Sequence, residues 1–228
     1  MVGAVFLHVA VICLVLGGVT ASRIVSVADL HGDWDHALRV LQAAGLIDVP
    51  VVAEVLNDPN GRPFARYQGV TWVGGNTTLV QTGDIVDRGT FSRDLYALFA
   101  ELRRQAPATG GRVVNLIGNH ELLNMEGLMH YGGVLETQEY GGMAQRLLDF
   151  APDGWIGRQL FEEFDAVFEM NGTVFVHAGV PPEYAKHGVH LLNQKVREML
   201  KTSFQAPVFG EFGPFWLRQY AMGLEAVA

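Results

Sequence analysis

Short apolar runs alternate with segments of helical period along most of the chain. Runs rich in apolar and β-branched residues at 24–28, 78–82 and 112–117 are typical of buried β-strands. Elsewhere, apolar residues recur every three or four positions, which predicts amphipathic helices. Because strands alternate with helices, we expect an α/β fold built in layers. The helical segments cover residues 34–45, 95–102 and 189–200.

Two pairs of strand-like runs lie between these elements, and a turn signal joins the members of each pair. The Asn-Asp-Pro-Asn-Gly sequence at 57–61 separates the first pair. Asn171-Gly172 separates the second and predicts a tight hairpin turn. A glycine-rich, mostly helical stretch precedes this hairpin, at 122–163. The two pairs of runs are 51–56 with 64–73, and 166–170 with 173–177.

The N-terminal segment differs in composition from the rest. No Asp, Glu, Lys or Arg occurs from Val2 to Ala21, and small residues end this run. The pattern predicts a cleaved signal peptide at 1–21, with an uncleaved membrane anchor as the alternative. Cleavage is favoured because a core strand beginning near Ile24 would leave an anchor almost no linker. We therefore expect the mature domain, 22–228, in the secretory pathway or outside the cell, without membrane contact after cleavage.

Composition limits the remaining classes of function. The chain has 228 residues, of which 49% are apolar, so one domain with a sizeable core fits it. The net charge of -8 and the lack of clustered Lys and Arg argue against nucleic-acid binding. The one cysteine, Cys13, lies in the leader, so we expect neither a disulfide framework nor a thiol nucleophile in the mature chain.

Polar clusters follow the ends of the predicted strands. In open α/β sheets, ligands bind beyond the carboxyl ends of the strands, so these loops can form one site. Taken singly, each cluster has an ordinary explanation, such as a turn, a helix cap or a buried histidine. Their occurrence at four successive strand ends favours a functional site. The clusters are Asp29-Leu30-His31-Gly32-Asp33, Gly83-Asp84-Ile85-Val86-Asp87-Arg88-Gly89, Gly118-Asn119-His120-Glu121 and His177-Ala178-Gly179.

The residue types in these clusters suit two neighbouring metal ions. Asp29 and His31 can hold one ion, and Asp84 can bridge both. Asn119 and His177 offer an amide oxygen and an imidazole nitrogen to the second ion. Mixed oxygen and nitrogen ligands favour Mn, Fe or Zn over calcium. Two such ions can clamp a phosphate and lower the pKa of a water between them.

The four clusters, in this order, resemble the signatures of the metal-dependent phosphoprotein phosphatases. The resemblance extends from Arg23 to Arg218, nearly the whole mature chain. Three segments are similar to the bacterial-type Shewanella-like branch of that family, which includes tyrosine-directed members. The three segments are 29–33, 175–180 and 213–218.

The resemblance implies a calcineurin-like metallophosphoesterase fold, a β-sandwich flanked by helices. It also implies a phosphoric monoester hydrolase in which a hydroxide bridging two metals attacks a phosphoprotein or small phosphomonoester. The metal ligands would be those given above, and Asn119 would also bind the substrate. His120 would be the general acid, oriented by Asp87, while Arg88 and Arg218 would bind phosphate oxygens. The phosphorylated residue would be tyrosine, with serine or threonine as the alternative.

Two features depart from the family pattern. Ala28 stands where the family has glycine. The family's last second-metal histidine, in a Gly-His-Thr-like motif, has no match before Ala228, and His187 and His190 lie too close to His177 to replace it. We therefore expect a domain incomplete at its C-terminus, weakly active and poorly soluble. The alternatives are a dinucleoside polyphosphate hydrolase and a degenerate, non-catalytic binding protein. The oligomeric state is left open.

Overall fold

A parallel sheet of three strands forms the centre of the molecule. The computed structural model describes residues 23–50 and 68–223. Strands β1 (Ile24–Val27), β4 (Thr78–Gln81) and β5 (Arg112–Asn115) pair in the order β1-β4-β5. Every residue of β4 is buried, since it is the central strand. The carboxyl ends of all three strands therefore lie at the same edge of the sheet.

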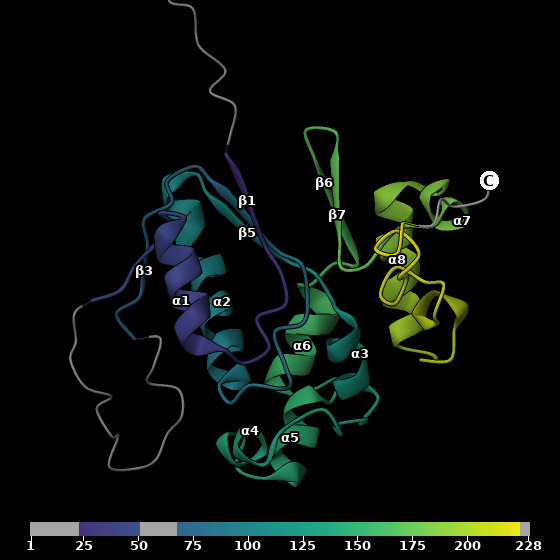
Figure 1. Ribbon diagram of the computed structural model, residues 1–228, viewed down its shortest axis with the longest axis horizontal. Coiled ribbons are helices and arrows are strands. Elements are labelled where there is room, and N and C mark those ends of the chain that lie inside the picture. The colour runs from purple at the N-terminus through teal and green to yellow at the C-terminus, as the bar shows by residue number, and fades with distance from the viewer. Residues whose placement is uncertain (1–22, 51–67, 224–228) are drawn as a thin grey trace, which may run out of the picture.

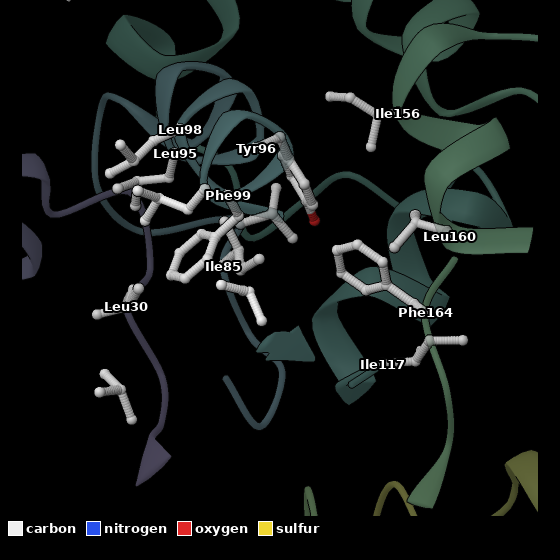
Figure 2. Close-up of a cluster of buried hydrophobic side chains, with 14 of the residues drawn as sticks. Leu30, Ile85, Leu95, Tyr96, Leu98, Phe99, Ile117, Ile156, Leu160 and Phe164 are labelled. Atoms are coloured by element: carbon white, nitrogen blue, oxygen red, sulfur yellow. The ribbon is translucent and has the colours of Figure 1, made fainter. Parts of the chain in front are cut away.

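Helices α1 (Trp34–Ala43) and α2 (Ser92–Gln105) pack on one face of this sheet (Figure 1). Asp33 caps α1, because its carboxylate accepts a hydrogen bond from the backbone N–H of His36. Figure 2 shows side chains of α2 meeting Leu30 and Ile85, which follow β1 and β4. The same core continues toward α6 (Trp155–Glu162) through Tyr96 and Phe164. The core thus lies directly beneath the loops that follow the strands.

A second, antiparallel sheet covers the other face. Strands β6 (Val167–Met170) and β7 (Thr173–Val176) form a hairpin. Its turn residues have positive φ, 55° at Asn171 and 76° at Gly172, as the hairpin prediction requires. Phe168 packs with Val80 and Val114 of the central sheet in a separate apolar cluster. Two sheets therefore face each other between helices, which confirms the predicted fold class.

The segment between β5 and β6 consists of short helices. Glycines with positive φ at 127, 141 and 142 interrupt it, so the predicted helical stretch is not one long helix. After β7, the chain forms α7 (Pro182–Ala185) and α8 (Gly188–Leu200), followed by irregular structure. The helices between β5 and β6 are α3 (Asn119–Met125), α4 (Val134–Glu139), α5 (Met143–Phe150) and α6 (Trp155–Glu162).

Strands β1, β4, β5, β6 and β7 each lie within a predicted run. Two differences are found elsewhere: the strand at Ile47–Asp48 was not predicted, and residues 68–70 of the run predicted at 64–73 are not part of a strand. Of the predicted run at 64–73, the part that forms a strand is β3 (Thr71–Trp72), which pairs with β2 (Ile47–Asp48). The predicted run at 51–56, the turn at 57–61 and the predicted signal peptide lie outside the described residues. No helix within residues 23–50 and 68–223 is long and apolar enough to span a membrane.

Candidate metal centre and active site

The carboxylate of Asp84 lies at the centre of the four loop clusters. Its Oδ2 atom is 3.6 Å from Nε2 of His31, which follows β1, and 3.6 Å from Nε2 of His177, which follows β7. Nε2 of His120, at the start of α3, is 4.0 Å away. Three segments far apart in sequence therefore place imidazole nitrogens around a buried carboxylate that belongs to a fourth.

Backbone carbonyl groups fix the tautomers of two of these histidines. Nδ1 of His31 lies 2.8 Å from the carbonyl oxygen of Val86, and Nδ1 of His177 lies 2.9 Å from that of Thr82. Because a carbonyl oxygen only accepts, Nδ1 carries a proton in both rings. Nε2 of His31, which has no hydrogen-bond partner, then presents its lone pair, the form in which histidine binds metal ions.

The loops that carry the site have an unusual backbone. Asp29, His31, Asp84, Asp87 and Arg88 all have positive φ, between 37° and 71°. Among the described residues, one other non-glycine residue shares this property, at the β6–β7 turn. Such conformations cost on the order of 1–3 kcal/mol each and concentrate at functional sites. The local strain at five site residues therefore marks this cluster as functional.

Glycines allow the loops to approach each other closely. A Cβ atom on Gly89 would lie 2.2 Å from the carbonyl oxygen of His31. A Cβ atom on Gly83 would lie 2.5 Å from the backbone nitrogen of Gly118. No larger residue fits at either contact without moving a loop. These glycines thus set the spacing between the predicted ligands.

Glu121, which the sequence analysis quoted without assigning it a role, connects two of the loops. Its fully buried carboxylate accepts hydrogen bonds from the backbone N–H groups of Asp84 (2.7 Å), Ile85 (2.8 Å) and Gly118 (2.8 Å). It also accepts one from the hydroxyl of Tyr96 (2.9 Å). Burial raises the pKa of Glu121, and the nearby charge of Asp84 adds to this effect. Glu121 therefore fixes the loop after β4 against the loop after β5.

His120 is paired with Asp87. Its Nδ1 atom is 2.6 Å from Oδ2 of Asp87, and its Nε2 atom is 3.1 Å from Nη2 of Arg88. Because a guanidinium only donates, Nε2 accepts from Arg88 and Nδ1 donates to Asp87 in this arrangement. Burial alone would lower the pKa of His120, but the bond to Asp87 and the charge of Asp84 raise it above its usual value. Arg88, in contrast, is exposed at the mouth of the site.

The donor atoms fit divalent metal ions. Nε2 of His31 is buried and has no hydrogen-bond partner, which a metal ion would supply. The donors form two groups, and within each group the ligand atoms all lie within 4.8 Å of one another. One group contains Asp84 with His31 and His120, and the other contains Asp84 with Asp29 and His177. Asp84 belongs to both groups, as expected for a bridging ligand.

The C-terminal segment also reaches the site. Nη2 of Arg218 donates to Oδ1 of Asn119 at 3.4 Å, and the same oxygen is 2.8 Å from Nε2 of His177. Every site residue predicted from the sequence therefore lies in this cluster. Sequence reasoning missed Tyr131, whose ring lies edge-on to His120 with centroids 5.1 Å apart. It also missed three buried polar residues behind Asp87, namely Asn124, Glu136 and Arg146.

The fold and this donor set define a class of protein, and comparison with known sequences agrees. Residues 22–218 match the calcineurin-like phosphoesterase family, so the chain belongs to that family. The chain is 34% identical over 208 residues to an uncharacterized protein of Schizosaccharomyces pombe, covering 86% of this chain and 57% of that protein. It is 26% identical over 246 residues to Shewanella-like protein phosphatase 2 of Arabidopsis thaliana, covering 87% of this chain and 58% of that one.

A solved structure supports the same family assignment. The cold-active protein-tyrosine phosphatase of a psychrophilic Shewanella species superposes with a TM-score of 0.69 and 25% sequence identity. The match covers 88% of this chain and 58% of that chain. The resemblance to the Shewanella-like branch is thereby confirmed. The chain spans slightly more than half the length of these relatives.

Proposed function

We propose that this chain is a metal-dependent protein phosphatase that hydrolyses phosphomonoesters. The observation that carries the proposal is the position of Asp84, whose carboxylate lies between two groups of oxygen and nitrogen donors. One carboxylate shared by two such groups is what a pair of neighbouring divalent ions requires. His120 belongs to one of these groups but is also paired with Asp87, and this pairing suits it to transfer a proton.

Asp29, His31 and Asp84 would hold the first ion, and Asp84, Asn119 and His177 the second. The mixture of carboxylate, amide and imidazole donors favours Mn, Fe or Zn. When bound, the two ions would polarise the phosphate and lower the pKa of a nearby water. Asn119 offers a neutral oxygen, so we expect the second ion to be held less tightly than the first.

The side chains around the donors bind the phosphate and move a proton. Arg88 is exposed and next to His120, so its planar guanidinium can turn toward two phosphate oxygens. Nε2 of His120 is then free to hold the proton that it donates to the leaving oxygen. Asp87 accepts from Nδ1 and keeps the ring in this orientation. Arg218 would bind a further phosphate oxygen, because it reaches Asn119 from the C-terminal segment.

Phosphotyrosine is the substrate that we favour over phosphoserine and phosphothreonine. Among the solved structures that resemble this chain are protein tyrosine phosphatases. The leaving group must also lie against His120, beside which the ring of Tyr131 is 49% exposed. An aryl leaving group can pack on that ring, whereas the serine side chain offers no ring to stack.

The proposal is tested by turnover of an aryl phosphate in the presence and absence of metal. We expect hydrolysis with Mn²⁺, and loss of activity after strong chelation that added Mn²⁺ restores. Undiminished turnover in chelator refutes the metal mechanism. Faster hydrolysis of a dinucleoside polyphosphate than of any monoester would identify the alternative enzyme, and less than one bound ion per chain would indicate a non-catalytic protein. The rates of hydrolysis of a phosphotyrosine peptide and a phosphoserine peptide of the same sequence then decide which residue is the preferred substrate.

We further propose that residues 1–21 direct the chain into the secretory pathway, where they are cleaved. The support is the lack of charged side chains from Val2 to Ala21. An anchored protein facing the same compartment is the alternative.

A further inference from the structure

A buried ionic network lies behind Asp87, on the side away from the donors. Arg146 of α5 and Glu136 of α4 are both fully buried. Nη2 of Arg146 donates to Oδ1 of Asp87 at 2.5 Å, and Nη1 donates to Oε2 of Glu136 at 3.1 Å. The network therefore links two helices of the segment between β5 and β6 to the carboxylate that holds His120.

The Arg146–Glu136 pair holds Asp87 at both its backbone and its side chain. The backbone N–H of Asp87 donates to Oε1 of Glu136 at 2.9 Å, while its Oδ1 accepts from Arg146. Its other carboxylate oxygen accepts from His120 and from Asn124. Asp87 has a φ of 71°, a conformation that persists only where its surroundings fix it.

The guanidinium of Arg146 is itself fixed on several sides. Its Nε and Nη2 atoms donate to Oδ1 of Asn124 at 3.1 and 2.8 Å, and it lies 5.1 Å from the ring centroid of Tyr140. The backbone of Gly132 packs against it, so closely that a Cβ atom there would lie 2.0 Å from Nη1. A side chain at position 132 would therefore have to displace the guanidinium.

The ordinary explanation of such a network is structural. Buried ion pairs are, however, weak contributors to stability, and apolar residues of similar volume often replace them without loss. A role in stability alone does not explain why the guanidinium lies on Oδ1 of Asp87 while Oδ2 of the same carboxylate holds His120. We propose that Arg146 is a positioning residue, which fixes the carboxylate of Asp87 so that His120 can protonate the leaving group. This inference rests on the proposed phosphatase function.

The test compares two aryl phosphates that differ in their need for protonation. Phenyl phosphate has a poor leaving group that requires a general acid, whereas 2,4-dinitrophenyl phosphate does not. For Arg146→Lys, which keeps the charge but not the planar fork, we expect kcat on phenyl phosphate to fall by about 10–100-fold, part of the usual contribution of a general acid. The kcat for the dinitrophenyl ester should change by less than about 3-fold. The KM should stay constant for both esters, because ground-state binding is not altered.

A matched control comes from a second ion pair that also involves α5. Arg93 of α2 pairs with Asp149 of α5 at 3.1 Å and is also largely buried. Arg93→Lys perturbs a comparable ion pair on α5 that does not include Asp87, so we expect equal, small effects on the two esters. Equal losses on both esters in Arg146→Lys, or no loss on either, would overturn the positioning role.

A second variant and a second readout do not depend on the stability of Arg146→Lys. Gly132→Ala displaces the guanidinium without removing its charge and should show the same selective loss on phenyl phosphate. The Nδ1 proton of His120, assigned in NMR spectra by its absence in His120→Asn, should shift or broaden in both variants. If the unaltered chain hydrolyses neither ester, the proposed function fails, and the proton signal alone decides the positioning. An unchanged signal in both variants refutes it.

Discussion

Replacing His120 with asparagine separates proton transfer from metal binding. The substitution keeps a side chain that can donate to Asp87, but it removes the atom at Nε2 that faces Asp84 and Arg88. That atom is 4.0 Å from Oδ2 of Asp84, farther than the Nε2 atoms of His31 and His177. We therefore expect metal content to stay nearly constant.

The expected loss of turnover follows from the value of a general acid. Such a group contributes about 10²–10⁴-fold. At about 1.4 kcal/mol per factor of ten, this range corresponds to about 3–6 kcal/mol of transition-state stabilisation. Asp84→Asn should behave differently, because it replaces the carboxylate that both donor groups share with an amide. It should lower the occupancy of both metal positions and reduce activity for that reason.

The assay measures kcat/KM on an aryl phosphate and the metal content of each purified variant by elemental analysis. His190→Asn serves as the control, because His190 is exposed on α8 and lies outside both donor groups. It should match the unaltered chain in both measurements. If His120→Asn lost its metals while Asp84→Asn kept them, the assignment of the two residues would be reversed and the reasoning refuted.

Three further predictions concern the loops, the metals and the leader. Gly89→Ala should lower the free energy of unfolding by about 1–3 kcal/mol, because the added Cβ atom would meet the carbonyl oxygen of His31. Gly133→Ala is the control and should be nearly neutral, because no atom lies within 4 Å of its added Cβ atom. Equal losses of stability in denaturant titrations of the two variants would contradict this prediction. Chelation should lower Tm and added Mn²⁺ should raise it, since metal binds the folded state; an unchanged Tm argues against a formed site. Protein secreted from expressing cells should begin after Ala21, and retention of Val2 would show that the segment is not cleaved.

The sequence was sufficient for the central sheet but not for the helical segment that follows it. Strands β1, β4 and β5 are short, and each contains two adjacent apolar residues, as is typical of buried parallel strands. Between β5 and β6, each helix is only about two turns long, and glycines with positive φ follow the ends of α3 and α4. Hydrophobic periodicity cannot resolve helices this short, so their boundaries depend on tertiary packing.

The predicted ligands could be found because parallel strands bring their carboxyl ends to one edge. Asp29, Asp84 and Asn119 each follow such a strand, so their proximity needs no knowledge of side-chain packing. Arg146 does not follow a strand, so no comparable pattern predicted that it lies near the site. An arginine on a short amphipathic helix is usually exposed, and only the fold reveals that this one is buried against Asp87. Its position could not be inferred from local sequence.

The charges of the site bear on how the proposed phosphate substrate would be attracted. The carboxylates of Asp29 and Asp84 offset the guanidinium groups of Arg88 and Arg218, and Arg146 lies against Asp87. Without metals, the site therefore offers a phosphate dianion little net attraction, in a chain whose net charge is -8. Two divalent ions held by these donors would make the local potential positive and favour binding of the dianion near Arg88. The anionic substrate that we propose would then be compatible with the acidic character of the whole chain.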